Sequence, residues 1–276
     1  MIDKRKMLIL IGFILCIALM VLASSYDLSI SQAVYNKNNL FSKIFETIGE
    51  LPLYALFIFS FLVFAVTFSK SANIWKLILS SACIILSYVI LIAFIDRMIG
   101  DFSLLYLSAF FSLILVGLGW FLLNKLSDDV IKKLYAFSIF SFSFCLITFL
   151  LNQGIKEIWG RSRFYLMAES NDYSLFTPWW QICGFTGSHS FYSGHTTSSM
   201  AILLLLPLAR IFKMQHNKYI LLHYIVFAFV ILVAISRVVR GAHFLSDVTF
   251  AIIINSIVYL ILYNRFGKKL ISKYEM

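Results

Sequence analysis

The chain has 276 residues, of which 61% are hydrophobic and only 13% are charged. A soluble domain is nearer half apolar and a quarter charged, so this composition excludes an ordinary soluble globular protein. The net charge of +10 is not a nucleic-acid signal, because most of it follows the membrane topology described below.

Apolar runs of roughly 17–22 residues, near the length of a bilayer crossing, recur along the chain. We expect eight crossings, with six or seven as alternatives, because the joint Asp96–Asp101 is either a tight turn or part of one broken span. The predicted spans are Met7–Ala23, Leu51–Phe68, Leu77–Ile95, Phe102–Leu123, Leu134–Leu151, Thr196–Phe212, Tyr219–Ile235 and Phe244–Tyr263. The predicted fold is an all-α, polytopic transmembrane helical bundle.

No internal repeat, low-complexity segment or Pro/Gly linker divides the chain, so we treat residues 1–276 as a single integral membrane domain. Within it, residues 1–150 are an N-terminal helical scaffold and residues 151–250 carry the candidate catalytic motifs. Three of the four cysteines fall inside apolar runs, and no Cys/His set has the spacing of a metal site. We therefore expect no metal and no cofactor.

The distribution of Lys and Arg sets the expected orientation. With the N-terminus in the cytoplasm, eight crossings place 15 of the 23 Lys and Arg on the inner side, as the positive-inside rule requires. Both termini are then cytoplasmic. Five of the eight outer cations lie within 156–163 and 236–240, and this cluster indicates an anionic ligand on the outer, periplasmic or extracellular face of a plasma (inner) membrane.

The first apolar run has a second interpretation. Three basic residues, a short apolar run and then Val21-Leu22-Ala23 resemble a secretory signal with a small-residue cleavage site. A run of this length is also sufficient to span the membrane. Cleavage would leave the rest of the chain on the same side, so the topology does not depend on it.

The long outer loop, roughly residues 153–194, supplies two groups of polar residues. Near its start Lys156 and Arg163 are seven residues apart, and at its end Ser193 and Gly194 precede His195 and the next span. Small residues at a helix start leave backbone N–H groups available to an anion.

The third group is Arg237-x5-His243-x3-Asp247. If the stretch after Arg237 is helical, His243 and Asp247 share one face, one turn apart. Asp247 would then accept the Nδ1–H of the imidazole and leave Nε2 free for chemistry. Ionisable residues beside a membrane span are costly to place there, which favours a functional role.

All three groups are expected at helix ends or in loops on one side of the membrane. Phosphoryl transfer needs such parts: cations for the non-bridging oxygens, a nucleophile in line with the leaving oxygen, and an acid to protonate that oxygen. Two histidines in different settings can divide the last two tasks.

With these three groups the chain resembles the type 2 phosphatidic acid phosphatase family, relatives of bacterial class A acid phosphatases and vanadium haloperoxidases. The family pattern is K-x6-RP, then PSGH, then SR-x5-H-x3-D. This chain has Lys156-x6-Arg163-Phe164, then Tyr192-Ser193-Gly194-His195, then Ser236-Arg237-x5-His243-x3-Asp247. Phe164 and Tyr192 replace two prolines, which affects loop geometry and substrate preference rather than the chemistry.

The resemblance implies a role for each matching residue. His243 would attack phosphorus and form a phosphohistidine, Asp247 would orient His243, and His195 would protonate the leaving oxygen and then activate water. Lys156, Arg163 and Arg237 would bind the phosphate oxygens, with Ser193 and the backbone N–H of Gly194 adding hydrogen bonds. Because His243 must be neutral and His195 protonated, the resemblance predicts a bell-shaped pH profile without a metal.

Each assignment has a plainer alternative. The pair His243–Asp247 would otherwise be a structural hydrogen bond, His195 a helix-start residue, and Lys156 and Arg163 headgroup contacts. Arg161 and Arg240 lie outside the motifs and are each either a second phosphate contact or a lipid-headgroup contact. Trp179 and Trp180 are either interfacial anchors or contacts for a substrate tail. No role is assigned to the remaining histidines, His189, His216 and His223.

The leading hypothesis is a metal-independent lipid phosphate or diphosphate phosphatase. Its expected partners are membrane lipids and a substrate such as undecaprenyl diphosphate, phosphatidic acid, phosphatidylglycerophosphate or a lipid A phosphate, with no nucleic acid and no protein partner. A phosphotransferase using the same intermediate is the alternative. A transporter predicts ionisable residues at the bilayer midplane, and a non-catalytic lipid-binding protein would have no need of the catalytic side chains.

Overall fold

The structure is a computed structural model that describes residues 4–99 and 104–275, and all regular secondary structure within these ranges is helical. This confirms the predicted all-α fold. The helices are α1 (Lys4–Val34), α2 (Leu40–Gly49), α3 (Leu51–Ser69), α4 (Ile74–Ile99), α5 (Leu105–Asn124), α6 (Asp128–Trp159), α7 (Phe164–Ser170), α8 (Gly194–Met200), η2 (Ala201–Leu204), α9 (Leu205–Ile211), α10 (His216–Val239), α11 (Leu245–Leu262), η3 (Tyr263–Gly267) and α12 (Lys268–Glu275).

Seven helical segments of the described residues are long and apolar enough to cross a membrane, which confirms a polytopic helical bundle. The difference from the eight predicted spans lies at Thr196–Phe212, which is built from α8, η2 and α9 instead of one long helix. The joint Asp96–Asp101 lies partly outside the described residues, so neither interpretation of it is tested.

Two helices extend well beyond their predicted ends. Helix α1 continues through Ala23 to Val34, so that Asp27 lies on it. Helix α6 runs to Trp159, which places Lys156 in its last turn and not in the outer loop as predicted. Three helices have no counterpart among the predicted spans: α2, α7 and α12. Helix α2 starts after Asn39, whose side chain accepts a hydrogen bond of 3.0 Å from the backbone N–H of Ser42, a typical N-cap.

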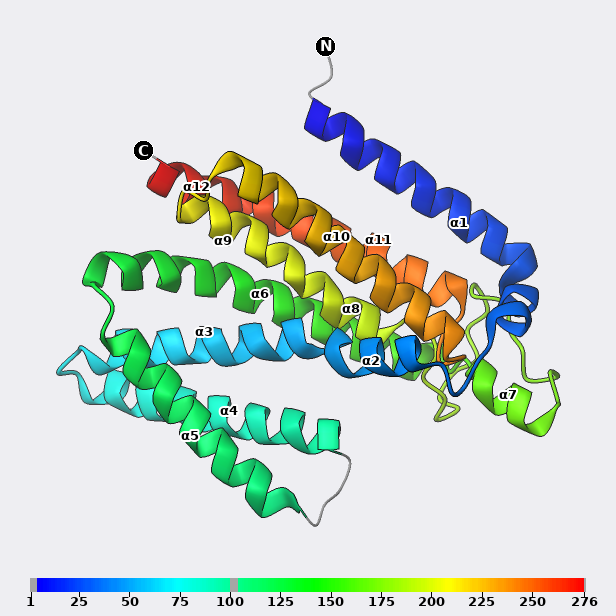
Figure 1. Ribbon diagram of the computed structural model, residues 1–276, viewed down its shortest axis with the longest axis horizontal. Coiled ribbons are helices and arrows are strands. Elements are labelled where there is room, and N and C mark those ends of the chain that lie inside the picture. Colours follow the sequence, from blue (N-terminus) through cyan, green and yellow to red (C-terminus); the bar gives the residue numbers. More distant parts are fainter. Residues whose placement is uncertain (1–3, 100–103, 276) are drawn as a thin grey trace. The chain divides into compact units, whose positions relative to one another are not determined.

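The chain forms two compact units, each assembled from separate stretches of sequence. One comprises residues 51–146, 201–223 and 261–276. In it α3, α4 and α5 lie side by side (Figure 1). Buried serines join its helices: Ser60 and Ser141 lie 3.0 Å apart through their hydroxyls, and the Ser80 hydroxyl donates to the carbonyl of Ala65. Small polar residues of this kind are typical of helix contacts in membranes.

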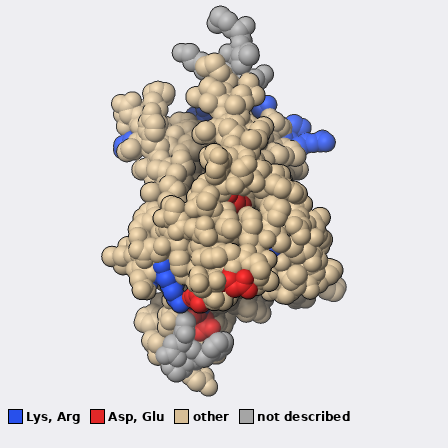
Figure 2. Space-filling view, turned by 90° about the vertical axis from the view of Figure 1, so that its right-hand side faces the viewer, with Lys and Arg blue, Asp and Glu red and all other residues tan. Residues whose placement is uncertain are grey.

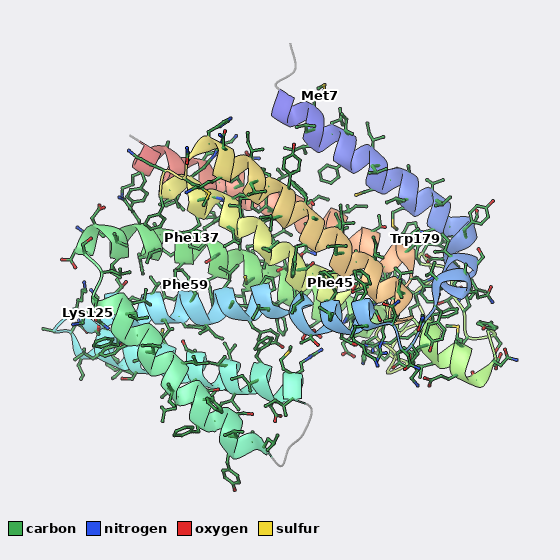
Figure 3. All side chains as sticks on the ribbon, viewed as in Figure 1. Met7, Phe45, Phe59, Lys125, Phe137 and Trp179 are labelled. Carbon is green, nitrogen blue, oxygen red and sulfur yellow. The ribbon has the colours of Figure 1, made fainter. Side chains whose placement is uncertain are left out.

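The other unit comprises residues 1–50, 147–200 and 224–260, and contains every candidate site residue. Its loop between α7 and α8 is fastened by tryptophans: the Trp159 indole donates to the carbonyl of Trp179, and the Trp179 indole donates to Ser24 on α1. Figure 3 shows Trp179 beside α1. Trp180 and Phe185 of this loop remain exposed. The two interpretations given for Trp179 and Trp180, interfacial anchors or contacts for a substrate tail, both stay predictions.

Candidate active site

The turn after α10 explains the spacing between Arg237 and His243. Gly241 has a φ of 69°, and the backbone N–H groups of Gly241 and Ala242 donate to the carbonyls of Val238 and Arg237. This is the Schellman pattern that ends many helices. A Cβ on Gly241 would lie 2.8 Å from the Tyr35 ring. Glycine is therefore required both by the positive φ and by the close approach of this ring. The turn brings the backbone N–H of His243 within 3.3 Å of the Arg237 carbonyl.

His243 therefore lies in the turn before α11, so the helical condition under which it was expected to share a face with Asp247 is not met. Asp247 is in the first turn of α11, where its Oδ2 accepts the backbone N–H of Phe244 at 2.9 Å. A side chain at this position that reaches back to the residue before the helix is half of a capping box. The need to cap α11 thus helps to fix the carboxylate beside the imidazole.

The Nδ1 atom of His243 is hydrogen-bonded, but to a different partner from the one predicted. It lies 2.7 Å from the carbonyl oxygen of Ser190 and 3.6 Å from Oδ2 of Asp247. Because a carbonyl only accepts, Nδ1 must carry the proton in this contact, and Nε2 of the neutral ring then carries the lone pair. The hydroxyl of Ser190 donates to Oδ2 of Asp247 at 2.5 Å, so Ser190 connects the two residues.

Burial decides the protonation state of His243. The ring is almost completely buried, and desolvation lowers its pKa to about 4. Asp247 acts in the opposite direction, while Lys156 and Arg237 oppose a further positive charge. His243 is consequently neutral near pH 7, the state that a nucleophilic imidazole requires.

Arg237 is buried with unused hydrogen-bonding capacity. Its Nη2 donates to Oε1 of Glu46 at 3.1 Å, whereas Nε and Nη1 have no hydrogen-bond partner among the described residues. Only 2% of the residue is exposed. Buried donors without partners are costly, and a bound anion beside His243 would satisfy them.

Lys156 reaches the same region from the last turn of α6. A Cβ placed on Gly194 would lie 3.0 Å from Nζ of Lys156 and 3.3 Å from Oδ1 of Asn152. The side-chain amide of Asn152 donates to the carbonyl of Tyr192 at 2.9 Å, which holds the turn before α8 against α6. Glycine at 194 therefore leaves room for the ammonium group.

His195 is the second residue of α8 and is more open than His243. Its side chain is 15% exposed, and Nδ1 lies 3.5 Å from Oε1 of Glu50, at the end of α2. Ser193 is completely buried, and its hydroxyl oxygen accepts from the hydroxyl and the backbone N–H of Thr196. The Ser193 hydroxyl can therefore still donate its own hydrogen to a ligand.

The two proline replacements are accommodated by packing. Phe164 is the first residue of α7, a position that proline also favours, and its buried ring packs edge-on against Tyr35 and Phe244. Tyr192 is buried against Phe250 on α11. Arg163, which precedes α7, is half-buried and close enough for its charge to repel that of Arg237.

Neither alternative considered for Arg161 describes its position. It is fully buried, bound to Asp27 and Asp247, with no access to a headgroup. Arg240 contacts Oε2 of Glu46 at 3.4 Å and donates to the carbonyl of Lys37. Sequence analysis missed Asp27, Glu46, Glu50 and Ser190, because none of them belongs to the three motifs and the predicted first span ended before Asp27.

The family model of the PAP2 superfamily matches residues 134–271, which is half of the chain. The chain belongs to the PAP2 superfamily. This confirms the resemblance drawn from the three motifs, all of which lie inside the matched region, and identifies a phosphatase family with membrane-spanning helices. No curated protein and no solved structure matched the chain.

The residues of the site come partly from inside the region matched by the PAP2 model and partly from before it. The cations, both histidines and Asp247 come from the matched region, whereas Asp27, Glu46 and Glu50 come from α1, α2 and the residue after α2, before the match begins. The chain thus adds three carboxylates from its N-terminal part to the charged residues of the PAP2 region.

Proposed function

We propose that this chain is a lipid phosphate or diphosphate phosphatase that works without a metal through a phosphohistidine on His243. The observation that carries the proposal is the placement of Arg237, buried with two donors that have no partner among the described residues, close to a neutral imidazole whose Nε2 carries the lone pair. An anion with non-bridging oxygens satisfies such donors, and a neutral nitrogen nearby attacks its central atom.

In the first step Nε2 of His243 forms a bond to phosphorus as the bond from phosphorus to the leaving oxygen breaks. His195 gives its proton to that oxygen. In the second step water attacks phosphorus, the bond from Nε2 to phosphorus breaks, and His195 takes a proton from the water. Lys156, Arg163 and Arg237 neutralise the charge on the non-bridging oxygens, while Ser193 and the N–H of Gly194 donate to them.

The proposed substrate is a lipid, attacked at the outer face of the plasma membrane. Support comes from the membrane-spanning helices, the exposed Trp180 and Phe185, and the cations on the outer side of the predicted topology. Undecaprenyl diphosphate, phosphatidic acid, phosphatidylglycerophosphate and lipid A phosphates all present the required anion on an apolar tail.

Phosphate release by the purified protein in detergent, with EDTA present, tests this function. Wild type is expected to release phosphate from at least one of these four lipids, and His243→Ala to abolish it. His189→Ala, in the loop between α7 and α8 and assigned no role, is the control. Normal turnover by His243→Ala would remove the nucleophile, and loss of wild-type activity with EDTA would remove the metal-free mechanism. Phosphate found on an added alcohol would identify a phosphotransferase instead.

A further inference from the structure

The most completely buried charged cluster is one that the proposed chemistry does not use. It contains Arg161, from the loop after α6, and Asp27, from the C-terminal third of α1. Arg161 has no exposed surface and Asp27 has 2%. Taking such charges out of water costs several kcal/mol for each ion, so their arrangement needs a compensating set of contacts.

Each nitrogen of the Arg161 guanidinium is engaged. Nε donates to the carbonyl of Thr177 at 2.9 Å, Nη1 to Oδ1 of Asp247 at 2.6 Å and to Ser246, and Nη2 to Oδ2 of Asp27 at 2.9 Å. Its Cζ lies 4.0 Å from the centre of the Phe244 ring. The two carboxylates therefore hold opposite sides of one planar fork, and Asp247 cannot shift without breaking this contact.

Asp27 is attached to the start of α11 as well as to Arg161. Its Oδ1 accepts the backbone N–H of Ser246 at 3.0 Å, and its Oδ2 accepts the hydroxyl of the same residue. A carboxylate at a helix N-terminus is stabilised by the free N–H groups there. Asp27 thus fixes the turn of α11 that carries Asp247, both directly and through Arg161.

The consequence for the nucleophile follows from the hydrogen bonds of Asp247. Arg161 occupies Oδ1, so that Oδ2 is left to Phe244 and Ser190, whose carbonyl holds the Nδ1–H of His243. The backbone N–H of Ser190 also donates to the carbonyl of Arg161 at 2.9 Å. A movement of Arg161 would therefore displace His243 both through Asp247 and through the backbone of Ser190.

We propose that Asp27 and Arg161 are positioning residues for His243, and that α1 thereby completes the active site of this chain. Neither residue touches the substrate. The inference rests on the proposed function, because it assigns these residues to the same nucleophile. It also gives α1, which lies outside the PAP2 match, a role beyond that of a membrane anchor.

The decisive variant is Asp27→Asn, which keeps the shape of the side chain and removes its charge. We expect kcat to fall roughly 10–100-fold with KM within about threefold of wild type, because substrate binding by Lys156 and Arg237 is unaffected. Ser31→Ala, a buried residue one turn further along α1 and outside the cluster, is the matched control and keeps wild-type kcat. Asp27→Glu restores the charge and recovers part of the loss.

A double-mutant cycle distinguishes positioning from a general loss of stability. In an Asp247→Asn background, adding Asp27→Asn should lower kcat by less than about a further threefold, because the contacts that connect Asp27 to His243 through Asp247 are already lost. Additive losses, or a lower thermal midpoint with unchanged kcat, would overturn the inference. Should Asp27→Asn fail to give folded protein, Arg161→Lys, which keeps the charge but loses the fork, is measured in the same way.

The two proposals fail differently. If the phosphatase proposal is wrong, wild type releases no phosphate from any lipid in the panel. If only the positioning role is wrong, wild type is active, His243→Ala is inactive, and Asp27→Asn and Arg161→Lys both turn over like wild type.

Discussion

The two histidines of the candidate site differ in what holds them. His243 is buried in a turn, with its Nδ1 bound to a backbone carbonyl and the charge of the neighbouring Asp247 compensated by Arg161. His195 lies on a short helix with 15% of its side chain exposed, and its Nδ1 faces Glu50 at 3.5 Å. Arg161, Arg237 and Asp247 are buried as well. On the face drawn in Figure 2, uncharged residues cover most of the surface.

The difference is chemical as well as structural. Both rings have a carboxylate at a similar distance, 3.6 Å for His243 and 3.5 Å for His195. At His243 burial and the neighbouring cations outweigh that carboxylate and keep the ring neutral. His195 is the more exposed of the two, with 15% of its side chain accessible against 3% for His243. Distance to a carboxylate alone therefore does not distinguish the proposed nucleophile from the proposed acid.

The largest effect that separates the two histidines is expected from His195→Asn. Loss of the acid should lower kcat/KM for an alkyl lipid phosphate by about 10²–10⁴-fold. An aryl phosphate, whose leaving oxygen needs no proton, should lose much less. Phosphate release from both substrates by wild type and variant measures this, with His243→Ala inactive on both. Equal losses on the two substrates would contradict the acid role.

Arg237→Lys should have the next largest effect. Lysine keeps the charge but cannot supply the two guanidinium donors that lack partners, and hydrogen bonds to charged groups are worth about 1.5–3 kcal/mol, or roughly 10–100-fold in kcat/KM. Arg240→Lys is the control, because the Arg240 guanidinium already contacts Glu46 and the Lys37 carbonyl, and it should stay within about threefold of wild type. If the two variants behave alike, Arg237 has no special role in binding phosphate.

A smaller effect is expected from Glu50→Gln. The substitution removes a negative charge 3.5 Å from the ring that donates a proton in the proposed mechanism, and we expect kcat/KM for an alkyl lipid phosphate to fall about 3–10-fold. The effect should vanish in a His195→Asn background and for an aryl phosphate. Glu157→Gln, an exposed carboxylate in the last turn of α6, is the control. A loss that persists without His195 would place Glu50 elsewhere in the mechanism.

The helical class could be predicted, and the three motifs recognised, because both depend on residues that are close together in the sequence. Arg237-x5-His243 is the length of a helix C-terminal turn closed by Gly241, and His243-x3-Asp247 places the carboxylate where it caps α11. The partner of Nδ1 was not predictable in this way. Ser190 is 53 residues from His243, and only the folded loop brings its carbonyl to the ring.

The carboxylates before the PAP2 match were missed for a related reason. Asp27 is 134 residues from Arg161, and no spacing rule connects residues so far apart in sequence. The predicted end of the first span at Ala23 also placed Asp27 in a loop, where a carboxylate needs no explanation. A helix that continues to Val34 makes it a buried charge that requires a partner.

The smallest expected effect is the response of His243 to mild acid. An ordinary histidine would be mostly protonated at pH 5, but burial lowers the pKa of His243 to about 4, so that only about a tenth of the ring is charged there. If the neutral form attacks, kcat/KM should fall less than about twofold between pH 7 and pH 5 through this group, and the acid limb of kcat/KM, which reports the free enzyme, should lie near pH 4. Profiles with an alkyl and an aryl phosphate separate enzyme from substrate, since the two phosphates ionise at different pH while a limb due to His243 stays in place. A common limb near pH 6.5 would mean that water reaches the ring, and that its contrast with His195 is one of position and not of protonation.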